Sequence, residues 1–306
     1  MNIAAVTESI RTAENVRMTP DTVARVAWAT IATPGDTRVG QLIGHLGAEQ
    51  ALHETLNGTR TTVAGVNVDS LRASMLQEYS AAKVTDTIAE AHELGWELLT
   101  PAHPSWPPYV SSLGSGEPFA LWVRGNSTVL GARTVVLTGT RNATRYGRHV
   151  TIDLASGLAE RGYVIASGTS QGIDTAALMS ACASAGTPIA VLLGGEDWAD
   201  PSTSSGWLSD VAEHGAVISE LPLGRSSWHF GRGRQLLAAL GTKTVIVEAE
   251  HDSSALSVAT TALGLGRPCG AVPGLAMSAS SAGCHRLIRD FGAQLVATID
   301  DVDDLT

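Results

Sequence analysis

The feature that most constrains this 306-residue chain is a regular alternation, beyond Gly131, of short apolar runs with amphipathic stretches. Strands separated by helices need crossover connections, and such connections produce a parallel sheet that helices cover on both faces. The pattern therefore predicts an α/β domain, roughly Arg133 to Val296, with a doubly wound, mostly parallel sheet. The six expected strands are Thr134–Thr138, Tyr163–Ala166, Pro188–Leu193, Ala216–Glu220, Thr244–Glu248 and Pro268–Val272.

The first hundred residues follow a different pattern. From Pro20 to about Glu97 the apolar residues recur at helical spacing, and Asp36 follows a Pro-Gly turn in a position to cap the next helix. Four prolines between Pro101 and Pro108 exclude a helix or a central strand, because each one removes a backbone donor. We therefore expect a helical domain over 1–100, a linker with a joining strand over 101–130, and the α/β domain over 131–306.

Glycine-rich loops after the first two strands of the α/β domain indicate a binding site. In a Rossmann-like sheet, ligands bind at the carboxyl ends of the strands. Both loops run directly into a helix, whose N-terminus favours an anion, and arginine can donate two parallel hydrogen bonds to phosphate. The first loop supplies Gly139, Thr140, Arg141, Arg145 and Tyr146, and the second supplies Ser167, Gly168, Thr169, Gln171 and Gly172.

Later loops add cations and aromatic rings to this expected site. The stretch from Trp228 to Arg234 contains His229, Phe230 and Arg232, and Gly274 belongs to a Pro-Gly turn. Basic side chains together with aromatic rings suit a groove that follows a single nucleic-acid strand, because the cations bind phosphates and the rings stack on bases. We predict a phosphate path lined by Gly139, Arg141, Gly168, Gln171, Gly172, Arg232 and Arg234.

Several classes of function lack their signatures in this chain. There is no Gly-x-Gly-x-x-Gly after the first α/β strand and no Walker lysine loop, which disfavours a dinucleotide site and an NTPase. Three distant cysteines, Cys182, Cys269 and Cys284, indicate neither a disulfide framework nor a zinc site. A net charge of −10 argues against nonspecific coating of duplex DNA. We expect no metal and no cofactor.

No signal peptide and no apolar run of ~20 residues is recognisable, so we expect a cytoplasmic protein without membrane association. The four aspartates near the end, between Asp300 and Asp304, are expected to cap or solvate a terminal turn.

The second loop also matches Gly-x-Ser-x-Gly, the pattern that surrounds the nucleophile of many hydrolases. Ser170 would be the nucleophile, and His229, His251 or His285 would be the base. Such a short pattern is common in a glycine-rich chain, and Gly172 is explained more simply by close helix packing. A serine hydrolase stays an alternative.

Taken in order along the chain, these motifs resemble the DNA-processing protein A family, known as DprA or Smf. The resemblance covers nearly the whole chain, and its front half is similar to the family's helical SAM-like domain. The residues that carry it in the α/β domain are Leu137–Arg141, Tyr146 and Gly147, Ser167 and Gly168, Gly172–Asp174, Ile189–Gly194, Ile218–Glu220, His229 and Phe230, Val247–Ala249, Gly266 and Arg267, Ala271–Gly274, Gly283–Arg289 and Gly292–Val296.

The resemblance implies a homodimeric protein without catalytic activity. Such a protein binds single-stranded DNA in a basic pocket and promotes loading of a RecA-type recombinase during DNA processing, transformation or recombination. Some family members also carry a C-terminal winged-helix domain, for which we expect no room before Thr306.

The chain departs from the family pattern at two places in the pocket. Family members usually carry Lys or Arg where this chain has Gln171, and usually read Arg-Asn-Arg where it has Gly233-Arg234-Gln235. A charged hydrogen bond is worth ~1.5–3 kcal/mol, so losing two would weaken binding about a hundredfold or more. The arginines expected to compensate are Arg141, Arg145, Arg148, Arg232 and Arg234.

A second alternative is a protein of the wider Rossmann-like group that binds nucleotides or cleaves their glycosidic bonds. Fewer cations in the pocket would suit a smaller ligand. Glu220 and Glu248, at strand ends, are the acids available for such chemistry, but the Pro-Gly-Gly loop of those enzymes is absent from the sequence.

Overall fold

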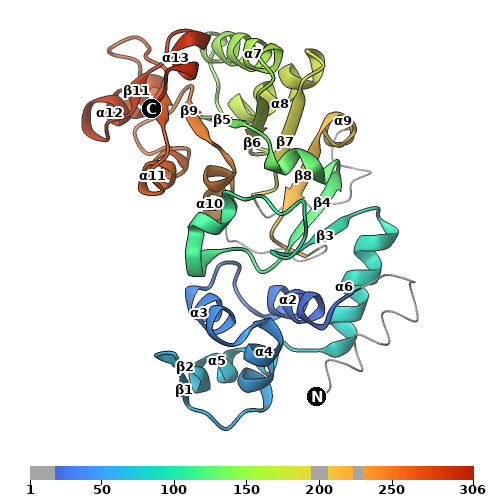
Figure 1. Ribbon diagram of the computed structural model, residues 1–306. Coiled ribbons are helices and arrows are strands. Elements are labelled where there is room, and N and C mark those ends of the chain that lie inside the picture. The colour runs from blue at the N-terminus through green and yellow to red at the C-terminus, as the bar shows by residue number, and fades with distance from the viewer. Residues whose placement is uncertain (1–17, 194–205, 223–229) are drawn as a thin grey trace. The chain divides into compact units, whose positions relative to one another are not determined.

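The computed structural model describes residues 18–193, 206–222 and 230–306 (Figure 1). The described residues belong to two compact units. Unit 1 is drawn from Met1–Trp106, Leu113–Trp122 and Glu220–Arg225, and unit 2 from Pro107–Ser112, Val123–Ser219 and Ser226–Thr306. The 3₁₀ helix η1 (Val110–Gly116) and strand β4 (Leu121–Gly125) each include residues of both units.

Unit 1 is mainly helical. Its elements are α2 (Pro20–Ile31), α3 (Thr37–Leu46), α4 (Ala48–Asn57), β1 (Thr62–Val63), β2 (Val66–Asn67), α5 (Val68–Met75), α6 (Ala81–Glu93) and β3 (Glu97–Leu99). The Asp36 side chain accepts a hydrogen bond from the Arg38 backbone N–H and caps α3, which confirms the predicted cap. Trp28 is fully buried and its Nε1 donates to the Ala48 carbonyl at 3.1 Å, which ties α2 to α4.

Unit 2 contains all six predicted strands, each within two residues of its expected ends. Its elements are η2 (Ser127–Gly131), β5 (Thr134–Thr138), α7 (Arg145–Glu160), β6 (Val164–Ser167), α8 (Ile173–Ala183), β7 (Thr187–Val191), α9 (Trp207–His214), β8 (Ala216–Ser219), α10 (Phe230–Leu240), β9 (Lys243–Ile246), α11 (Leu256–Gly264), β10 (Cys269–Ala271), η4 (Ala279–Ser281), α12 (Ala282–Asp290), β11 (Gln294–Leu295) and α13 (Ile299–Asp303).

The strands of unit 2 form a doubly wound sheet. From β11 to β8 their order is β11-β10-β9-β5-β6-β7-β8, and each neighbouring pair is parallel. The chain builds outward from β5 to β8 and then returns to place β9 on the other side of β5. This reversal is the topological switch at which sheets of this kind bind ligands. The predicted Rossmann-like α/β fold is confirmed.

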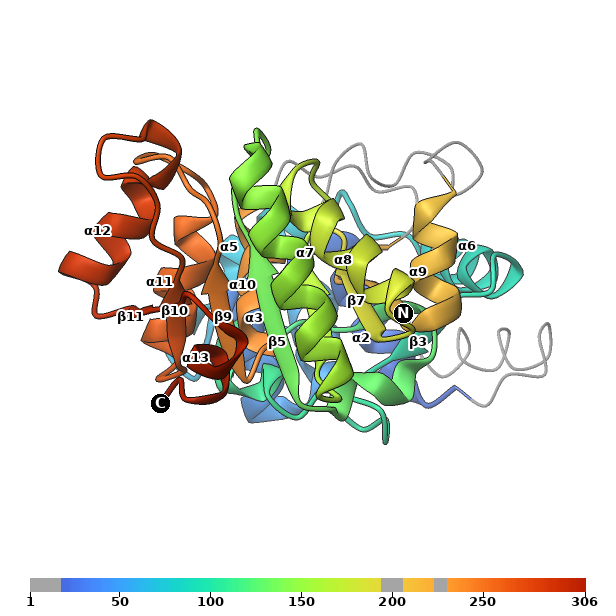
Figure 2. The same ribbon diagram turned by 90° about the horizontal axis from the view of Figure 1, so that it is seen from above.

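Helices cover both faces of this sheet. Figure 2 shows α7, α8 and α9 side by side. Leu154 of α7 and Ile173 of α8 belong to the same buried cluster as Val245 of β9. The next residue of that strand, Ile246, joins a second cluster with Ala259 of α11. Successive residues of β9 therefore meet different helices, as the alternation along a strand requires.

The acidic end of the chain does more than cap a terminal turn. Arg161, which follows α7, forms ion pairs with Asp300 at 2.6 Å and with Asp303. The Lys243 ammonium group donates to the carbonyl of Asp303 at 2.6 Å. These contacts hold α13 against the amino ends of the central strands. No described helix is both long and apolar enough to cross a membrane.

Candidate functional site

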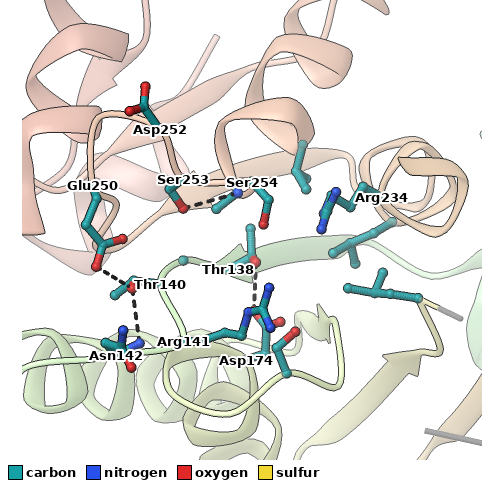
Figure 3. Close-up of a pocket in the computed structure, with 16 residues that line it drawn as sticks. Thr138, Thr140, Arg141, Asn142, Asp174, Arg234, Glu250, Asp252, Ser253 and Ser254 are labelled. Carbon is teal, nitrogen blue, oxygen red and sulfur yellow. Dashed lines mark hydrogen bonds between the residues drawn. The ribbon is translucent and has the colours of Figure 1, made fainter. Parts of the chain in front are cut away.

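A cavity of about 490 Å³ lies at the carboxyl ends of β5, β6 and β9, beside the topological switch (Figure 3). Its volume falls within the ~300–1,000 Å³ that is usual for small-ligand sites. The lining residues are Thr138, Gly139, Thr140, Arg141, Asn142, Ser170, Asp174, Leu193, Arg234, Leu237, Glu250, Asp252, Ser253, Ser254, Ala255 and Val258.

Two arginines make one side of this cavity cationic. Arg141 follows β5 and is exposed, whereas Arg234 lies on α10 and is partly buried. Burial lowers the pKa of Arg234, the charge of Arg141 lowers it further, and the Asp174 charge opposes both. Within the described residues neither guanidinium has a hydrogen-bond or ion-pair partner. Two like charges that lack such partners create a site for an anion with several oxygens.

Asp174 lies beneath the two arginines, in the first turn of α8. Only 3% of it is exposed, and the Thr138 hydroxyl donates to its Oδ1 at 2.7 Å. Burial raises the pKa of Asp174 to about 6, although hydrogen bonds from Thr138 and from backbone N–H groups act in the opposite direction. The carboxylate thus joins β5 to α8 at the floor of the cavity.

This raised pKa predicts how stability depends on pH. An unfolded chain protonates Asp174 near its ordinary value of 3.8, so between about pH 4 and pH 6 the folded protein binds more protons. Above pH 6 the buried Asp174 carries a negative charge, which lowers the free energy of unfolding. As the pH falls Asp174 is protonated and this destabilisation disappears. We expect the free energy of unfolding of the wild type to rise, relative to Asp174→Asn, between pH 7 and pH 5. Urea titrations measure this difference, and an unchanged difference would contradict the assignment.

Glu248 organises the helix that borders the cavity. It is buried, and its two carboxylate oxygens accept from the Thr144 backbone N–H at 2.8 Å and from the Thr144 hydroxyl at 2.7 Å. Thr144 in turn caps α7 by accepting from the Gly147 N–H at 3.1 Å. Glu248 therefore has a structural function. Glu220, the other acid considered for glycosidic-bond cleavage, is buried and does not line the cavity.

Four of the sequence-predicted site residues line the cavity: Gly139, Thr140, Arg141 and Arg234. Arg145 and Tyr146 lie on the first turn of α7, outside the cavity lining, and both are exposed. The Tyr146 hydroxyl donates to the Pro273 carbonyl at 2.7 Å, which places this ring beside the Pro-Gly turn that contains Gly274.

The second predicted loop lies mostly beneath the surface. Ser167, Gly168, Thr169 and Gly172 are buried, and the Ser167 hydroxyl donates to the Leu137 carbonyl at 2.6 Å. Gly172 has a φ of +91°, and a Cβ atom there would lie 2.4 Å from the Thr140 carbonyl oxygen. These residues support the cavity from below. Gln171 is exposed and is not among the lining residues.

The remaining predicted site residues either do not line the cavity or lie outside the residues that the structure describes. Arg232 does not line the cavity and donates a hydrogen bond to Gln235 on the same helix. The N–H of Gly274 donates to His285 at 3.3 Å. His229 lies outside the described residues, and Phe230 is described only as the first residue of α10.

Ser170 lines the cavity, but its surroundings do not favour a hydrolase. Among the described residues no histidine hydrogen-bonds to the Ser170 hydroxyl, since His251 pairs with Asp252 and His285 contacts Gly274. The third candidate base, His229, is not described.

The sequence reasoning missed the wall that follows β9. Glu250, Asp252, Ser253 and Ser254 line the cavity opposite the arginines (Figure 3). The available signal was their position just after a predicted strand, because ligand sites gather at strand ends. Only the order of strands in the sheet shows that this strand end lies next to Arg141.

Comparisons with known proteins identify the family of the chain. The family model of DNA recombination-mediator protein A matches residues 97–305. The DNA processing protein DprA of Mycobacterium tuberculosis is 36% identical over 297 residues, which cover 90% of this chain and 73% of that protein.

Two solved structures have a similar fold. DprA of Streptococcus pneumoniae superposes with a TM-score of 0.75 at 23% identity, over 94% of this chain and 98% of that one. DNA processing protein A of Helicobacter pylori, described for its single-stranded DNA binding mode, has a TM-score of 0.60 at 25% identity, over 69% and 97%.

Proposed function

Because the chain belongs to the DNA recombination-mediator protein A family, we propose that its cavity binds the phosphate backbone of single-stranded DNA. The observation that carries this proposal is the pair of arginines, Arg141 and Arg234, which line one cavity and form no hydrogen bond or ion pair with any described residue. A phosphodiester group supplies the anionic oxygens that such a pair can share.

Three further features support this ligand. The N-terminus of α7 lies beside the cavity and adds a partial positive charge, and Arg145 at its first position is exposed. Tyr146, also on the first turn, is 48% exposed and offers a ring on which a base can stack. The structure of the homologous Helicobacter pylori protein is described for its single-stranded DNA binding mode. The overall charge of −10 disfavours binding of the strand at surfaces away from the two arginines.

We further propose that the protein passes the bound strand to a RecA-type recombinase, acts as a homodimer and catalyses no covalent step. The family's description as a recombination mediator supports the first point. The partly exposed Phe291 and Leu295, near the sheet edge formed by β11, offer apolar surface for a second copy. Light scattering of the protein alone tests the dimer, and assembly of a recombinase filament on coated strands tests the transfer.

The experiment for the central proposal is fluorescence anisotropy of a labelled ~20-nucleotide single strand and of a matched duplex, at low and at physiological salt. We expect the single strand to bind more tightly. A plot of the logarithm of its association constant against the logarithm of salt concentration should have a slope of about −2. This value follows because Arg141, Arg234 and Arg145 each neutralise one phosphate, and each such contact contributes ~0.7 to the slope. Absence of binding at low salt would contradict the proposal and would direct attention to nucleotides.

A further inference from the structure

Besides Asp174 at its floor, the cavity is lined by two arginines and by two acids that come from different loops. Arg141 and Arg234 come from the loop after β5 and from α10, whereas Glu250 and Asp252 come from the loop after β9 (Figure 3). In the described part of the chain, no ion pair joins these arginines to these two acids. Opposite charges that line one cavity without neutralising each other fit a ligand with an anionic group at one end and hydrogen-bond donors at the other.

Glu250 is the better fixed of the two acids. The Thr140 hydroxyl donates to Glu250 Oε1 at 2.9 Å and itself accepts from the Asn142 backbone N–H at 3.1 Å. The Glu250 carbonyl accepts from the Ser253 N–H at 3.0 Å, and a Cβ atom at Gly283 would lie 2.5 Å from that carbonyl oxygen. Both the side chain and the backbone of Glu250 are therefore held in place by neighbouring residues.

The second carboxylate oxygen of Glu250 is available to a ligand. No described residue donates a hydrogen bond to Oε2, and Glu250 is only partly buried where it lines the cavity. Asp252, by contrast, has a 95% exposed side chain that pairs with His251 at 2.8 Å. Glu250 is thus a positioned acceptor inside the cavity, and Asp252 lies at its rim.

We propose that Glu250 makes the cavity selective for nucleobases with an exocyclic amino group while the two arginines hold the adjoining phosphate. This inference rests on the proposed function. A carboxylate accepts a hydrogen bond from the N4 amino group of cytosine. Thymine presents a carbonyl oxygen at the equivalent position, and two facing oxygens repel each other. Adenine carries a comparable amino group, so cytosine and adenine should be preferred over thymine.

The test compares two ~20-nucleotide homopolymers, one of deoxycytidine and one of thymidine, by anisotropy at pH 7.5. Both bases are pyrimidines, so the exocyclic group at C4 is the main difference that the cavity meets. We expect the wild type to bind the deoxycytidine strand about tenfold more tightly. In Glu250→Gln the ratio of the affinities for the deoxycytidine and thymidine strands should approach one, because an amide can accept a hydrogen bond from cytosine or donate one to thymine.

A matched control is Glu213→Gln, which removes the same charge from an exposed position on α9. Its effect on the two strands should be equal, so that the wild-type ratio is kept. A wild-type ratio of one, or an unchanged ratio in Glu250→Gln, would overturn the selectivity and leave the proposed function intact. Failure of both strands to bind would overturn the proposed function, and the selectivity with it.

Discussion

Replacing Arg141 and Arg234 together by alanine is expected to weaken binding of a ~20-nucleotide single strand about a hundredfold or more. Each guanidinium can donate a charged hydrogen bond to phosphate, worth ~1.5–3 kcal/mol, and tenfold in affinity corresponds to ~1.4 kcal/mol. Both side chains line the cavity, and neither forms a hydrogen bond or an ion pair with a described residue. Anisotropy titrations at low salt measure the loss, and the salt slope should shrink by about 1.4 units.

The matched control removes the same charge elsewhere. Arg60 and Lys83 are exposed in unit 1 and do not line the cavity, so their joint replacement by alanine should change affinity only slightly. An equal loss in the two double variants would mean that net charge, and not the cavity, determines binding. Thermal unfolding of each variant verifies that the fold is retained.

Gly172→Ala is expected to produce a large loss of stability. Gly172 has a φ of +91°, and an added Cβ atom would lie 2.4 Å from the Thr140 carbonyl oxygen and 2.5 Å from that of Arg141. The backbone conformation alone costs about 1–3 kcal/mol for a residue with a side chain, and overpacking adds about 1–3 kcal/mol. Because the clash displaces the loop that carries Arg141, affinity for the single strand should fall as well.

Gly162→Ala is the control for this prediction. Gly162 also has a positive φ, +79°, but an added Cβ atom would meet nothing within 4 Å. Its replacement should therefore cost only the conformational part, about 1–3 kcal/mol, and leave DNA binding unchanged. Urea unfolding compares the two variants, and equal losses of stability would show that close packing against the Arg141 loop is unimportant.

Local patterns in the sequence were sufficient to locate the strands and part of the cavity. Alternating apolar and amphipathic stretches predicted β5 to β10, because burial on both faces requires apolar runs of strand length. The loop after β5 was identified because small residues and an arginine follow a strand and precede a helix. Gly139, Thr140 and Arg141 indeed line the cavity.

Side-chain direction was harder to predict. Ser167 and Thr169 belong to a loop with the composition of a phosphate site, yet both are buried, and the Ser167 hydroxyl is bonded to the backbone of β5. Arg232 and Arg234 are two positions apart on α10, and residues at that spacing do not share a helix face. Of the two, only Arg234 lines the cavity. This difference could be predicted only if it were known that α10 begins before both arginines.

The position of Glu250 and Asp252 in the cavity could not be predicted, because it depends on the order of the strands in the sheet. Thr140 and Glu250 are 110 residues apart and meet only because β9 returns to lie beside β5. No local spacing encodes that return. The same limit applied to Asp303, whose bonds with Arg161 and Lys243 connect the end of the chain to segments that are distant in sequence.

The return of β9 also has a consequence for how the protein emerges from the ribosome. β5 pairs with β6 on one side and with β9 on the other, and β9 is synthesised only after α7 to α10. At 5–20 residues per second, the interval is on the order of 5 to 20 seconds. During that interval one edge of β5 has no partner, and unpaired edges invite association with other chains. The ligand cavity is therefore completed late, and a nascent chain that stalls before Lys243 exposes the strand that later supports it.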